Sequence, residues 1–298
     1  MAASTVHTHI PVSTKQSNPD PSCKPFLRWA GGKRWLIPFW TSLVARVPFQ
    51  RYHEPFLGSG AMFFSLPEGH DCFLSDVNPD LIKTYEAVKN TPNDVIKAFR
   101  RLKNTSEIYY KTRKQQPRLP SQIAARFIYL NQTSFNGLYR VNRDGEYNVP
   151  FGNRNNWHYD TNRIILASDK LKRRNTVLSA QDFHQSFSCV GPGDLVFLDP
   201  PYAVSNNGSD KENGFVAYND TLFSLEDQRH LADCIRHIRA IGAFYVLTNA
   251  NDAIIKRIFD FGDTVIQLSR HSHIAGNADK RKRITESIFT NITLNIKP

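Results

Sequence analysis

The segment from Asp194 to Tyr202 restricts the fold of this chain more than any other stretch. Its first five residues, Asp-Leu-Val-Phe-Leu, form a short apolar run that predicts a buried central β-strand. The sequence Asp-Pro-Pro-Tyr follows at once, so two prolines end the strand and Asp199 lies at its carboxyl end. Open α/β sheets bind ligands at that edge, and the segment therefore predicts an α/β protein with a site here.

A carboxylate, prolines and an aromatic ring in succession suit an amino group on a flat heterocycle. Because proline has no N–H, the carbonyl groups of Asp199 and Pro200 are left to accept hydrogen bonds from a substrate, and Tyr202 offers a stacking face. Accepting bonds from both amino hydrogens would localise the nitrogen lone pair, most strongly in the transition state. The alternative, an ordinary turn after a strand, is not excluded by these four residues alone.

The charge balance favours a polyanionic partner. The 298 residues include 38 Lys plus Arg against 27 Asp plus Glu, which gives a net charge of +11. This excess indicates a nucleic-acid partner, and the alternative is a basic surface without such a partner. No apolar run approaches the roughly 20 residues that span a bilayer, so no membrane partner and an intracellular location are expected. The four cysteines and ten histidines are scattered, which predicts mostly buried, reduced thiols and no metal site.

The amino-terminal part contains a first candidate for cofactor binding. Residues 1–25 are polar and rich in Ser, Thr and Pro, which is typical of a disordered tail. Order is expected to begin at the glycine-hinged loop 26–33, which leads into an apolar stretch. In that loop Trp29 supplies a stacking face and Lys33 a cation for a carboxylate, although an ordinary turn before a helix would look similar.

A second candidate is the unit 52–64, a short strand, a Gly-x-Gly turn and the start of an apolar helix. Gly58 and Gly60 would admit an adenosyl group or an amino acid, while the missing third glycine argues against a pyrophosphate loop. The next strand, 72–75, ends at Asp76, near the spacing at which an acid binds ribose hydroxyls. Asp76 could equally cap a helix at 80–89, and both roles are compatible.

Residues 91–159 have a different character. Eight basic residues and the single acid Glu107 lie between positions 97 and 118, which predicts a phosphate-contacting face or a solvated helical surface. After an apolar helix at 123–130, the pairs Asn-Gly and Asp-Gly signal tight turns, and the second closes a predicted hairpin within 135–152. Phe135, Arg140 and Arg143 on this hairpin could wedge a base step and read guanine edges.

Alternation of helices and strands resumes after residue 159. A strand at 176–179 precedes Asp182, which could hold an adenine ring, and Ser224 begins a capping box that predicts a helix start. The segment 203–220 is read as a mobile loop over the site. The remaining predicted elements are a helix at 163–171, a strand at 243–248, a helix through 254 and 258, and two terminal antiparallel strands at 264–269 and 284–292.

In this order the pieces resemble the DNA adenine-N6 methyltransferase (Dam) family, the D12 class of the alpha group of amino-methyltransferases. The resemblance covers nearly all of residues 26–298. It rests on Phe-Leu-Arg-Trp-Ala-Gly-Gly-Lys, Glu-Pro-Phe-Leu-Gly-Ser-Gly, Ser-Asp-Val-Asn, Phe-Asn-Gly-Leu-Tyr-Arg-Val-Asn, Tyr-Asn-Val-Pro-Phe-Gly and Asp-Pro-Pro-Tyr. It implies a class I S-adenosylmethionine-dependent methyltransferase (Rossmann-like) fold. The implied domains are a tail at 1–25, a catalytic domain at 26–82 and 160–298, and an inserted helical and β-hairpin target-recognition domain at 83–159.

The resemblance also implies roles for individual residues. S-adenosylmethionine is the expected cofactor, a flipped adenine the expected substrate group, and no metal is needed. The expected catalytic residues are Asp199, Pro200 and Tyr202; the cofactor-binding residues are Trp29, Lys33, Phe56, Gly58, Gly60, Asp76, Asp182 and Asp199; the DNA-binding residues are Arg28, Phe135, Asn136, Leu138, Arg140 and Pro150.

The expected activity is methyl transfer to the N6 amino group of adenine in double-stranded DNA, with GATC as the preferred site. Cytosine-N4 methylation is the nearest rival chemistry, and a catalytically silent DNA-binding regulator is the rival of another class. A monomer or weak dimer in the cytoplasm of a bacterial or phage-infected cell, associated with the nucleoid, is expected. A cognate restriction endonuclease encoded elsewhere would be a further partner.

Overall fold

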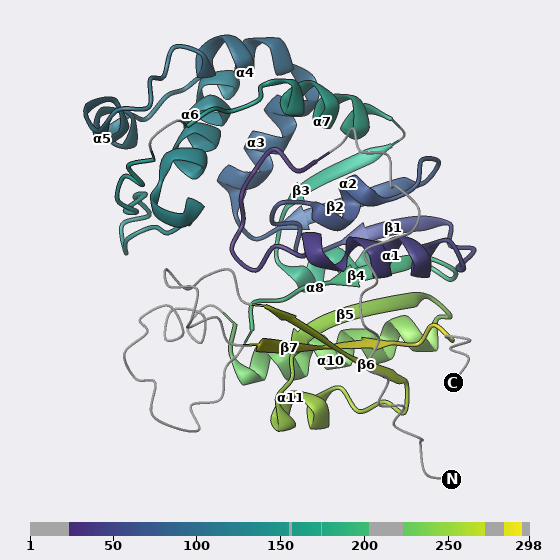
Figure 1. Cartoon of the computed structure of the whole chain (residues 1–298). Helices are drawn as coiled ribbons and strands as arrows, with labels where there is room; N and C mark the ends of the chain where they lie inside the picture. The colour runs from purple at the N-terminus through teal and green to yellow at the C-terminus, as the bar shows by residue number, and fades with distance from the viewer. Residues whose placement is uncertain (1–23, 155–156, 174, 203–222, 272–282, 294–298) are drawn as a thin grey trace. The chain divides into compact units, whose positions relative to one another are not determined.

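The computed structural model describes residues 24–154, 157–173, 175–202, 223–271 and 283–293 (Figure 1). The chain divides into two compact units. Unit 1 contains Val47–Phe56 and the described residues of His184–Pro298, and unit 2 contains the described residues of Thr14–Arg46 and Leu57–Phe183. The predicted tail up to residue 23 and the predicted loop 203–220 lie outside the described residues. The predicted catalytic and target-recognition domains are divisions by function and stay a prediction.

Unit 1 is built on strands in the order β1-β4-β5-β7-β6. These are β1 (Arg51–Glu54), β4 (Leu195–Leu198), β5 (Phe244–Ala250), β6 (Thr264–His271) and β7 (Arg283–Thr290). The first three run parallel, while β7 is antiparallel to both β5 and β6, so the expected antiparallel finish to a parallel sheet is confirmed. All four residues of β4 are buried, as expected for a central parallel strand covered on both faces.

The helix α10 (Leu225–Ala240) of unit 1 packs against β5 (Figure 1). The Ser224 hydroxyl accepts from the Asp227 backbone N–H, and the Asp227 carboxylate accepts from the Ser224 backbone N–H, which confirms the predicted capping box. Its apolar stripe is fully buried. Also in this part of the chain are α8 (Phe183–Ser186), η3 (Phe187–Cys189) and α11 (Ala253–Ile258), the last of which packs against α10. The capped helix fixes the orientation of side chains in its first turn.

Unit 2 has two parallel strands, β2 (Asp71–Asp76) and β3 (Thr176–Ala180), and a larger set of helices. The helices are η1 (Arg34–Leu36), α1 (Ile37–Val44), α2 (Ala61–Ser65), α3 (Pro79–Asn90), α4 (Pro92–Phe99), α5 (Ser106–Lys114), α6 (Pro120–Thr133), η2 (Phe135–Gly137) and α7 (Asn162–Lys172). The mostly buried α6 packs against α3, α4 and α5 and forms the centre of this helical part. The two units together hold the mixed α/β content that the sequence predicts.

Two sequence expectations in unit 2 need correction. The helix α3 is capped by Asn78, whose side chain accepts from the N–H groups of Asp80 and Leu81, so Asp76 is not the cap. The predicted hairpin within 135–152 contains no strand in the described residues and is held by two isolated antiparallel bridges. At its tip the Asn142 side chain accepts from the backbone at positions 144 and 146. These side-chain bonds act together with backbone bonds from the Asn142 N–H to the Glu146 carbonyl and from the Gly145 N–H to the Asn142 carbonyl, so the tip is a turn closed by the bridge between Val141 and Tyr147.

Other expectations concern membranes, metals and thiols. No helix within the described ranges is long and apolar enough to cross a membrane, and those ranges hold no cluster of three or more His, Cys, Asp or Glu side chains placed to bind a metal ion. Of the three described cysteines, Cys72 is buried, Cys234 is half-buried and Cys189 is exposed. The expectation of mostly buried thiols is therefore wrong for the described part of the chain.

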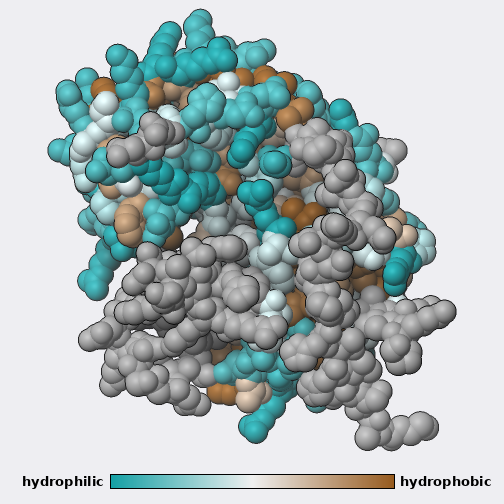
Figure 2. All heavy atoms as spheres, viewed as in Figure 1, coloured by the Kyte–Doolittle hydropathy of each residue, from teal (hydrophilic) through white to brown (hydrophobic). Residues whose placement is uncertain are grey.

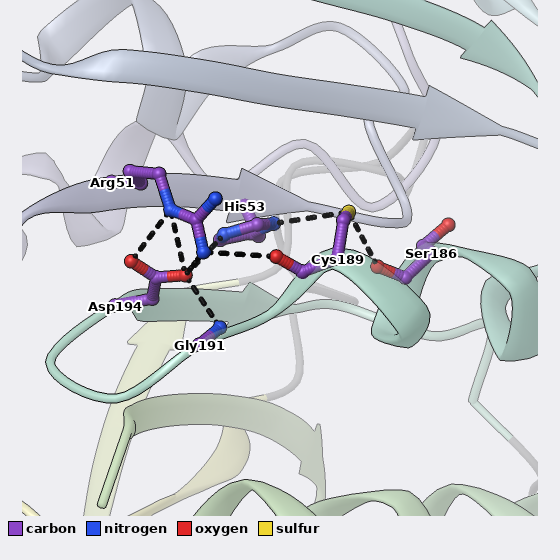
Figure 3. Close-up of polar contacts among 6 residues, drawn as sticks. All are labelled: Arg51, His53, Ser186, Cys189, Gly191 and Asp194. Atoms are coloured by element: carbon purple, nitrogen blue, oxygen red, sulfur yellow. Dashed lines mark hydrogen bonds and ion pairs between the residues drawn. The ribbon is translucent and has the colours of Figure 1, made fainter.

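An ionic cluster ties the beginning of β1 to the residue before β4 (Figure 3). Arg51 donates from Nε and Nη2 to the Asp194 carboxylate, and His53 Nε2 lies 2.9 Å from Asp194 Oδ2. The Gly191 N–H donates to the same oxygen over 2.7 Å. Burial opposes ionisation of Asp194, but the bonds from Arg51, Gly191 and His53 outweigh it and lower the pKa of the carboxyl. The cluster therefore holds an ionised carboxylate between two parallel strands.

Mild acid should destabilise the protein through His53. Burial is the largest influence on this imidazole and lowers its pKa below the ordinary 6.5, although Asp194 opposes the shift. The unfolded chain therefore takes up a proton near pH 6.5 that the folded chain takes up only at lower pH, so the free energy of unfolding falls as pH decreases below about 6.5. In urea unfolding curves, His53→Gln should flatten this fall between about pH 6.5 and 5. An equally steep fall in the variant would assign it to other groups.

Candidate functional site

Asp199–Tyr202, which we call the acceptor segment, leaves β4 at its carboxyl end as predicted. Asp199 is half-buried, and its Oδ1 accepts a 2.7 Å hydrogen bond from the Thr248 hydroxyl. Thr248 is fully buried in β5, the strand paired with β4, and it also contacts the carbonyl of Leu198. The neighbouring strand therefore fixes the orientation of the Asp199 carboxylate.

Tyr202 is anchored through its hydroxyl, which donates a 2.6 Å hydrogen bond to Glu286 Oε2. Glu286 lies in β7 and is 1% exposed. Burial is the main cause that raises the pKa of Tyr202 well above its ordinary value, and the negative charges of Asp199 and Glu286 add to it. The hydroxyl therefore stays protonated, and the bond to Glu286 holds the ring in one orientation.

Two buried amides hold the middle of the acceptor segment. Gln228 Nε2 donates to the Pro201 carbonyl over 3.4 Å, and Gln228 Oε1 accepts from Asn249 Nδ2 over 2.9 Å. Both side chains are fully buried, Gln228 in the first turns of α10 and Asn249 in β5. This network engages the Pro201 carbonyl, and not the Asp199 and Pro200 carbonyls that the sequence assigns to a substrate.

The sequence reasoning missed all four of these supporting residues. One of them left a readable signal: Glu286 falls in register with Ile284 and Ile288 in a strand of alternating residues, where a buried acid requires a partner. Thr248 and Asn249 end an apolar run, and Gln228 follows the capping box by one residue. Their partners lie between 21 and 84 residues away along the chain, which no local pattern encodes.

In unit 2 the glycine turn after β1 packs tightly against its surroundings. Gly58 has a φ of +47°, and a Cβ on it would lie 2.7 Å from the Trp29 ring. Its N–H donates to Asp76 Oδ2 over 3.0 Å, and its carbonyl accepts from the Tyr85 hydroxyl over 3.1 Å. Gly60 also has a positive φ, of +65°. The structure thus brings together Trp29, Gly58 and Asp76, three of the predicted cofactor-binding residues.

Asp76 and Lys33 are buried charged residues of unit 2. The Asp76 carboxylate accepts from the N–H groups of Gly58 and Asn78, yet burial dominates and raises the pKa of its carboxyl. Lys33 is 3% exposed and donates from Nζ to the Gly31 carbonyl over 2.9 Å. A carboxylate beside a glycine turn suits ribose hydroxyls, and a buried ammonium suits the carboxylate of an amino acid. These residues therefore fit S-adenosylmethionine.

Phe56 and Asp182 are two further predicted cofactor contacts. Phe56 belongs to unit 1, is half-buried, and meets the Phe223 ring edge-on at a centroid distance of 5.7 Å. Asp182 is exposed and follows β3 in unit 2. The sequence predicts Asp182 just after a strand, and the structure places it two residues after the end of β3.

The predicted DNA-binding residues gather on residues 134–152 of unit 2, which we call the recognition loop. Four of them are exposed and one is half-buried: Phe135, Asn136, Arg140 and Pro150, and Leu138 respectively. The Phe135 N–H donates to the Pro150 carbonyl over 2.9 Å, and Arg140 donates from Nε to Asn148 Oδ1 over 2.7 Å. The loop therefore holds an exposed aromatic ring beside a proline and presents an oriented arginine.

Arg28 lies against the same loop. Its backbone N–H and carbonyl pair with the side chain of Asn131 at 2.8 and 2.6 Å. A Cβ on Gly137 would lie 2.8 Å from Arg28 Nε, so the guanidinium group packs directly on this turn. The Trp29 ring stacks on that of Tyr139 at 5.7 Å. The structure thus joins the predicted cofactor loop and the recognition loop within one unit.

The helix α5, which carries part of the predicted basic face, is bonded to the recognition loop. Arg113 Nη1 and the hydroxyl of the fully buried Tyr109, both in α5, donate to the Val149 carbonyl over 3.3 and 2.9 Å. Arg126 donates from Nε to the Thr112 carbonyl near the end of α5. Figure 2 shows mostly hydrophilic side chains over α4 to α6. Arg113 of the predicted face therefore has a structural role, whereas the lysines of the face are exposed.

A methyl group at Gly152 should distort the recognition loop. Its Cβ would lie 2.6 Å from the Ser134 carbonyl oxygen and 2.9 Å from that of Thr133, both backbone atoms that cannot rotate away. We expect Gly152→Ala to lower the free energy of unfolding by about 1–3 kcal/mol and to weaken DNA binding. The matched control is Gly145→Ala, at φ +78° with open space around it, which should cost only the left-handed backbone penalty of about 1–2 kcal/mol. Urea unfolding and DNA titration of both variants test this, and equal DNA affinities would contradict it.

Comparisons with known proteins identify similar sequences. The model of the family described as D12 class N6 adenine-specific DNA methyltransferase matches residues 29–274. The chain is 32% identical over 278 residues to "Type II methyltransferase M1.LlaDCHI" of Lactococcus lactis subsp. cremoris, covering 90% of this chain and 95% of that protein. It is 31% identical to "Type II methyltransferase M.MjaIII" of Methanocaldococcus jannaschii, covering 87% and 95%. It is 28% identical to the "DNA adenine methylase" of Escherichia coli K12, covering 88% and 93%.

Proposed function

The chain belongs to the family of D12 class N6 adenine-specific DNA methyltransferases, and on this basis we propose that it methylates the adenine of GATC in double-stranded DNA. Adenine methylation in DNA, with S-adenosylmethionine as methyl donor, is the reaction of the family. The family match favours adenine over cytosine-N4 chemistry. Our proposal adds the recognition sequence, the flipping of the target base and the residues that perform each role.

The anchoring of the acceptor segment supports the catalytic part of the proposal. Asp199, fixed by Thr248, would accept one hydrogen of the adenine N6 amino group, and the Pro200 carbonyl would accept the other. Tyr202, fixed by Glu286, would stack on the adenine ring. Adenine within a duplex cannot reach such a segment, so the base must leave the stack. The N6 nitrogen, its lone pair localised by these bonds, would then take the methyl group directly, without a covalent enzyme intermediate.

The proposed cofactor-binding residues differ in the part of S-adenosylmethionine that each would contact. We propose that Asp76 binds ribose hydroxyls, that Lys33 binds the carboxylate of the methionine part, and that Trp29 with the turn at Gly58 and Gly60 packs on the ligand. Phe56, Asp182 and Asp199 complete the proposed set. The bound cofactor supplies a methyl group on a positively charged sulfur. The residues of this chain would supply its binding and orientation. The burial of Lys33, which donates to the Gly31 carbonyl, and of Asp76, which accepts from the Gly58 N–H, supports this role.

The exposed residues of the recognition loop support its proposed role on DNA. Arg140 would read a guanine in the major groove, and Phe135 would enter the base stack beside Pro150 and Leu138. Arg28 and Asn136 would contact the target strand. Two of the similar proteins are named type II methyltransferases, so we propose a cognate restriction endonuclease as a further partner of the system. Residues 83–159 would form the target-recognition domain of a monomer or weak dimer.

Removal of the Thr248 hydroxyl should slow methyl transfer more than it weakens cofactor binding. Thr248→Val keeps the shape of the side chain but leaves Asp199 without its 2.7 Å bond, and a hydrogen bond to a charged group is worth about 1.5–3 kcal/mol. We expect kcat to fall by about ten- to a hundredfold, with a smaller change in the KM for S-adenosylmethionine, because Asp199 is only one of several proposed cofactor contacts. The control is Thr290→Val, which removes a buried hydroxyl bonded to the Tyr245 carbonyl and should cost stability only. Equal kcat losses in both variants would contradict a positioning role.

Methyl transfer from labelled S-adenosylmethionine tests the proposed site. One duplex contains GATC, and a matched duplex has GGCC at this position, so that both adenine–thymine pairs of the site are replaced by guanine–cytosine pairs. Label in the first duplex alone is expected. Label in both would overturn the GATC assignment, and binding without label in either would favour a silent regulator.

Base flipping is tested separately with 2-aminopurine in place of the target adenine. This base fluoresces strongly only when it leaves the stack, so fluorescence should rise when the protein binds the GATC duplex. A duplex with 2-aminopurine two steps outside the site is the control. Unchanged fluorescence at the target position in a saturated complex would contradict flipping.

A further inference from the structure

A cysteine, a histidine and an aspartate lie in line at the beginning of β4 (Figure 3). Cys189 Sγ is 4.0 Å from His53 Nδ1, within hydrogen-bond reach of a sulfur atom. On the far side of the ring, His53 Nε2 is 2.9 Å from Asp194 Oδ2. Cys189 is exposed, whereas the side chains of His53 and Asp194 are each 1% exposed. Residue Cys189 therefore reaches the surface, while the two groups behind its thiol are shielded from water.

The charges around His53 define where its proton lies. Asp194 is ionised and accepts from Arg51 and the Gly191 N–H, and burial lowers the pKa of His53. A neutral imidazole beside a carboxylate places its hydrogen on Nε2, so the lone pair of Nδ1 faces the sulfur. Burial raises the pKa of the Cys189 thiol, which therefore rests protonated. The Cys189 thiol donates to the Ser186 carbonyl over 3.3 Å, so its hydrogen must turn from that oxygen to His53 Nδ1, behind which the ionised Asp194 lies.

We propose that Cys189 is a thiol modification site that reacts with low-molecular-weight disulfides, with His53 as its base. His53 Nδ1 takes the proton from the Cys189 thiol as the sulfur attacks one sulfur of the disulfide. A new mixed disulfide forms, the original sulfur–sulfur bond breaks, and the departing thiolate takes the proton from His53. The protein thiol and the disulfide are consumed, and a mixed disulfide and a free thiol are formed. The disulfide is therefore the only oxidant that the step requires.

This site is separate from methyl transfer. Asp194 precedes β4 and the acceptor segment follows it, so the two groups lie at opposite ends of the same strand of unit 1. The described chain also contains natural reference thiols. Cys72 is buried and donates to the His70 carbonyl over 3.4 Å, and Cys234 is half-buried in α10.

Glutathione disulfide is the probe for the experiment. The full-length protein is treated at pH 7, quenched with acid, and digested, and mass spectrometry gives the extent of glutathione addition at each cysteine over time. We expect Cys189 to react about tenfold faster than the same cysteine in a synthetic peptide of residues 185–193. Its rate should be nearly constant from pH 7 to 8, because the base is already neutral, whereas the rate of the peptide should rise about tenfold per pH unit.

The variants His53→Gln and Asp194→Asn test the base. Both should slow Cys189 to the rate of the peptide and restore the steep pH dependence, while circular dichroism verifies that they are folded. The pH profile of the unmodified protein keeps the proposal testable if a variant fails to fold. A rate at Cys189 no faster than the peptide, rising about tenfold per pH unit, would overturn the proposal. An unchanged profile in a folded His53→Gln protein would overturn it as well.

Discussion

Replacement of Asp199 by alanine should lower kcat for adenine methylation by about a thousandfold, as expected when a group that stabilises the transition state is removed. The carboxylate would accept a hydrogen of the N6 amino group, and no other side chain of the acceptor segment can replace it. Thr248, whose hydroxyl donates to Asp199 over 2.7 Å, would be left without this partner. Because Asp199 is only half-buried, the folded state should persist.

Single-turnover methylation of a GATC duplex measures this effect directly, since it separates chemistry from product release. The matched control is Asp233→Ala, an exposed acid of α10 that pairs with Arg236 on the surface; its kcat should be unchanged. Near-normal transfer by a folded Asp199→Ala protein would contradict the proposed role. A loss of unfolding free energy that accounts for the lost rate would contradict it too.

Replacement of Arg140 by alanine should relax sequence discrimination at one guanine of the site. An arginine that contacts a guanine edge with two hydrogen bonds contributes about 1–3 kcal/mol of discrimination, or roughly a five- to 150-fold ratio. Arg140 is exposed on the recognition loop, and the 2.7 Å bond from its Nε to Asn148 orients the guanidinium group. The substitution removes no buried contact, so stability should not change.

The measurement compares kcat/KM on GATC with kcat/KM on duplexes changed at one guanine–cytosine pair. The contrast variant is Lys111→Ala, which removes an exposed lysine of α5. This variant should weaken binding to all duplexes by the same factor and reduce the salt dependence of binding. If Arg140→Ala also lowers kcat/KM by the same factor on all duplexes, Arg140 contacts phosphate and does not read a base.

The sequence predicted the elements whose residues carry local patterns. Apolar runs gave the positions of β4 and β5, Gly58 and Gly60 marked a turn with positive φ, and the capping box marked the beginning of α10. These signals depend on residues within a few positions of one another, so they can be recognised without knowledge of the tertiary structure. The parallel arrangement with an antiparallel end followed from the spacing of strands and helices.

Contacts between distant residues could not be predicted in the same way. Glu286 and Tyr202 are 84 residues apart, and their pairing depends on β7 lying next to β5. The recognition loop is predicted as two paired strands because Asp-Gly commonly closes a hairpin. The structure contains the turn, to which the Asn142 side chain also bonds, but its two arms pair only through isolated bridges. Asp76 and Asn78 both suit a helix cap, and only the structure distinguishes them.

Position-resolved identification of the methylated base tests the central claim most directly. The duplex should contain one GATC together with adenines and cytosines in other contexts, and the digested product should be analysed by mass spectrometry after methylation to completion. We predict one N6-methyladenine per strand, located in GATC, and no methylated cytosine. Methyl groups on adenines outside GATC would contradict the proposed recognition, and N4-methylcytosine would contradict the chemistry assigned to the acceptor segment.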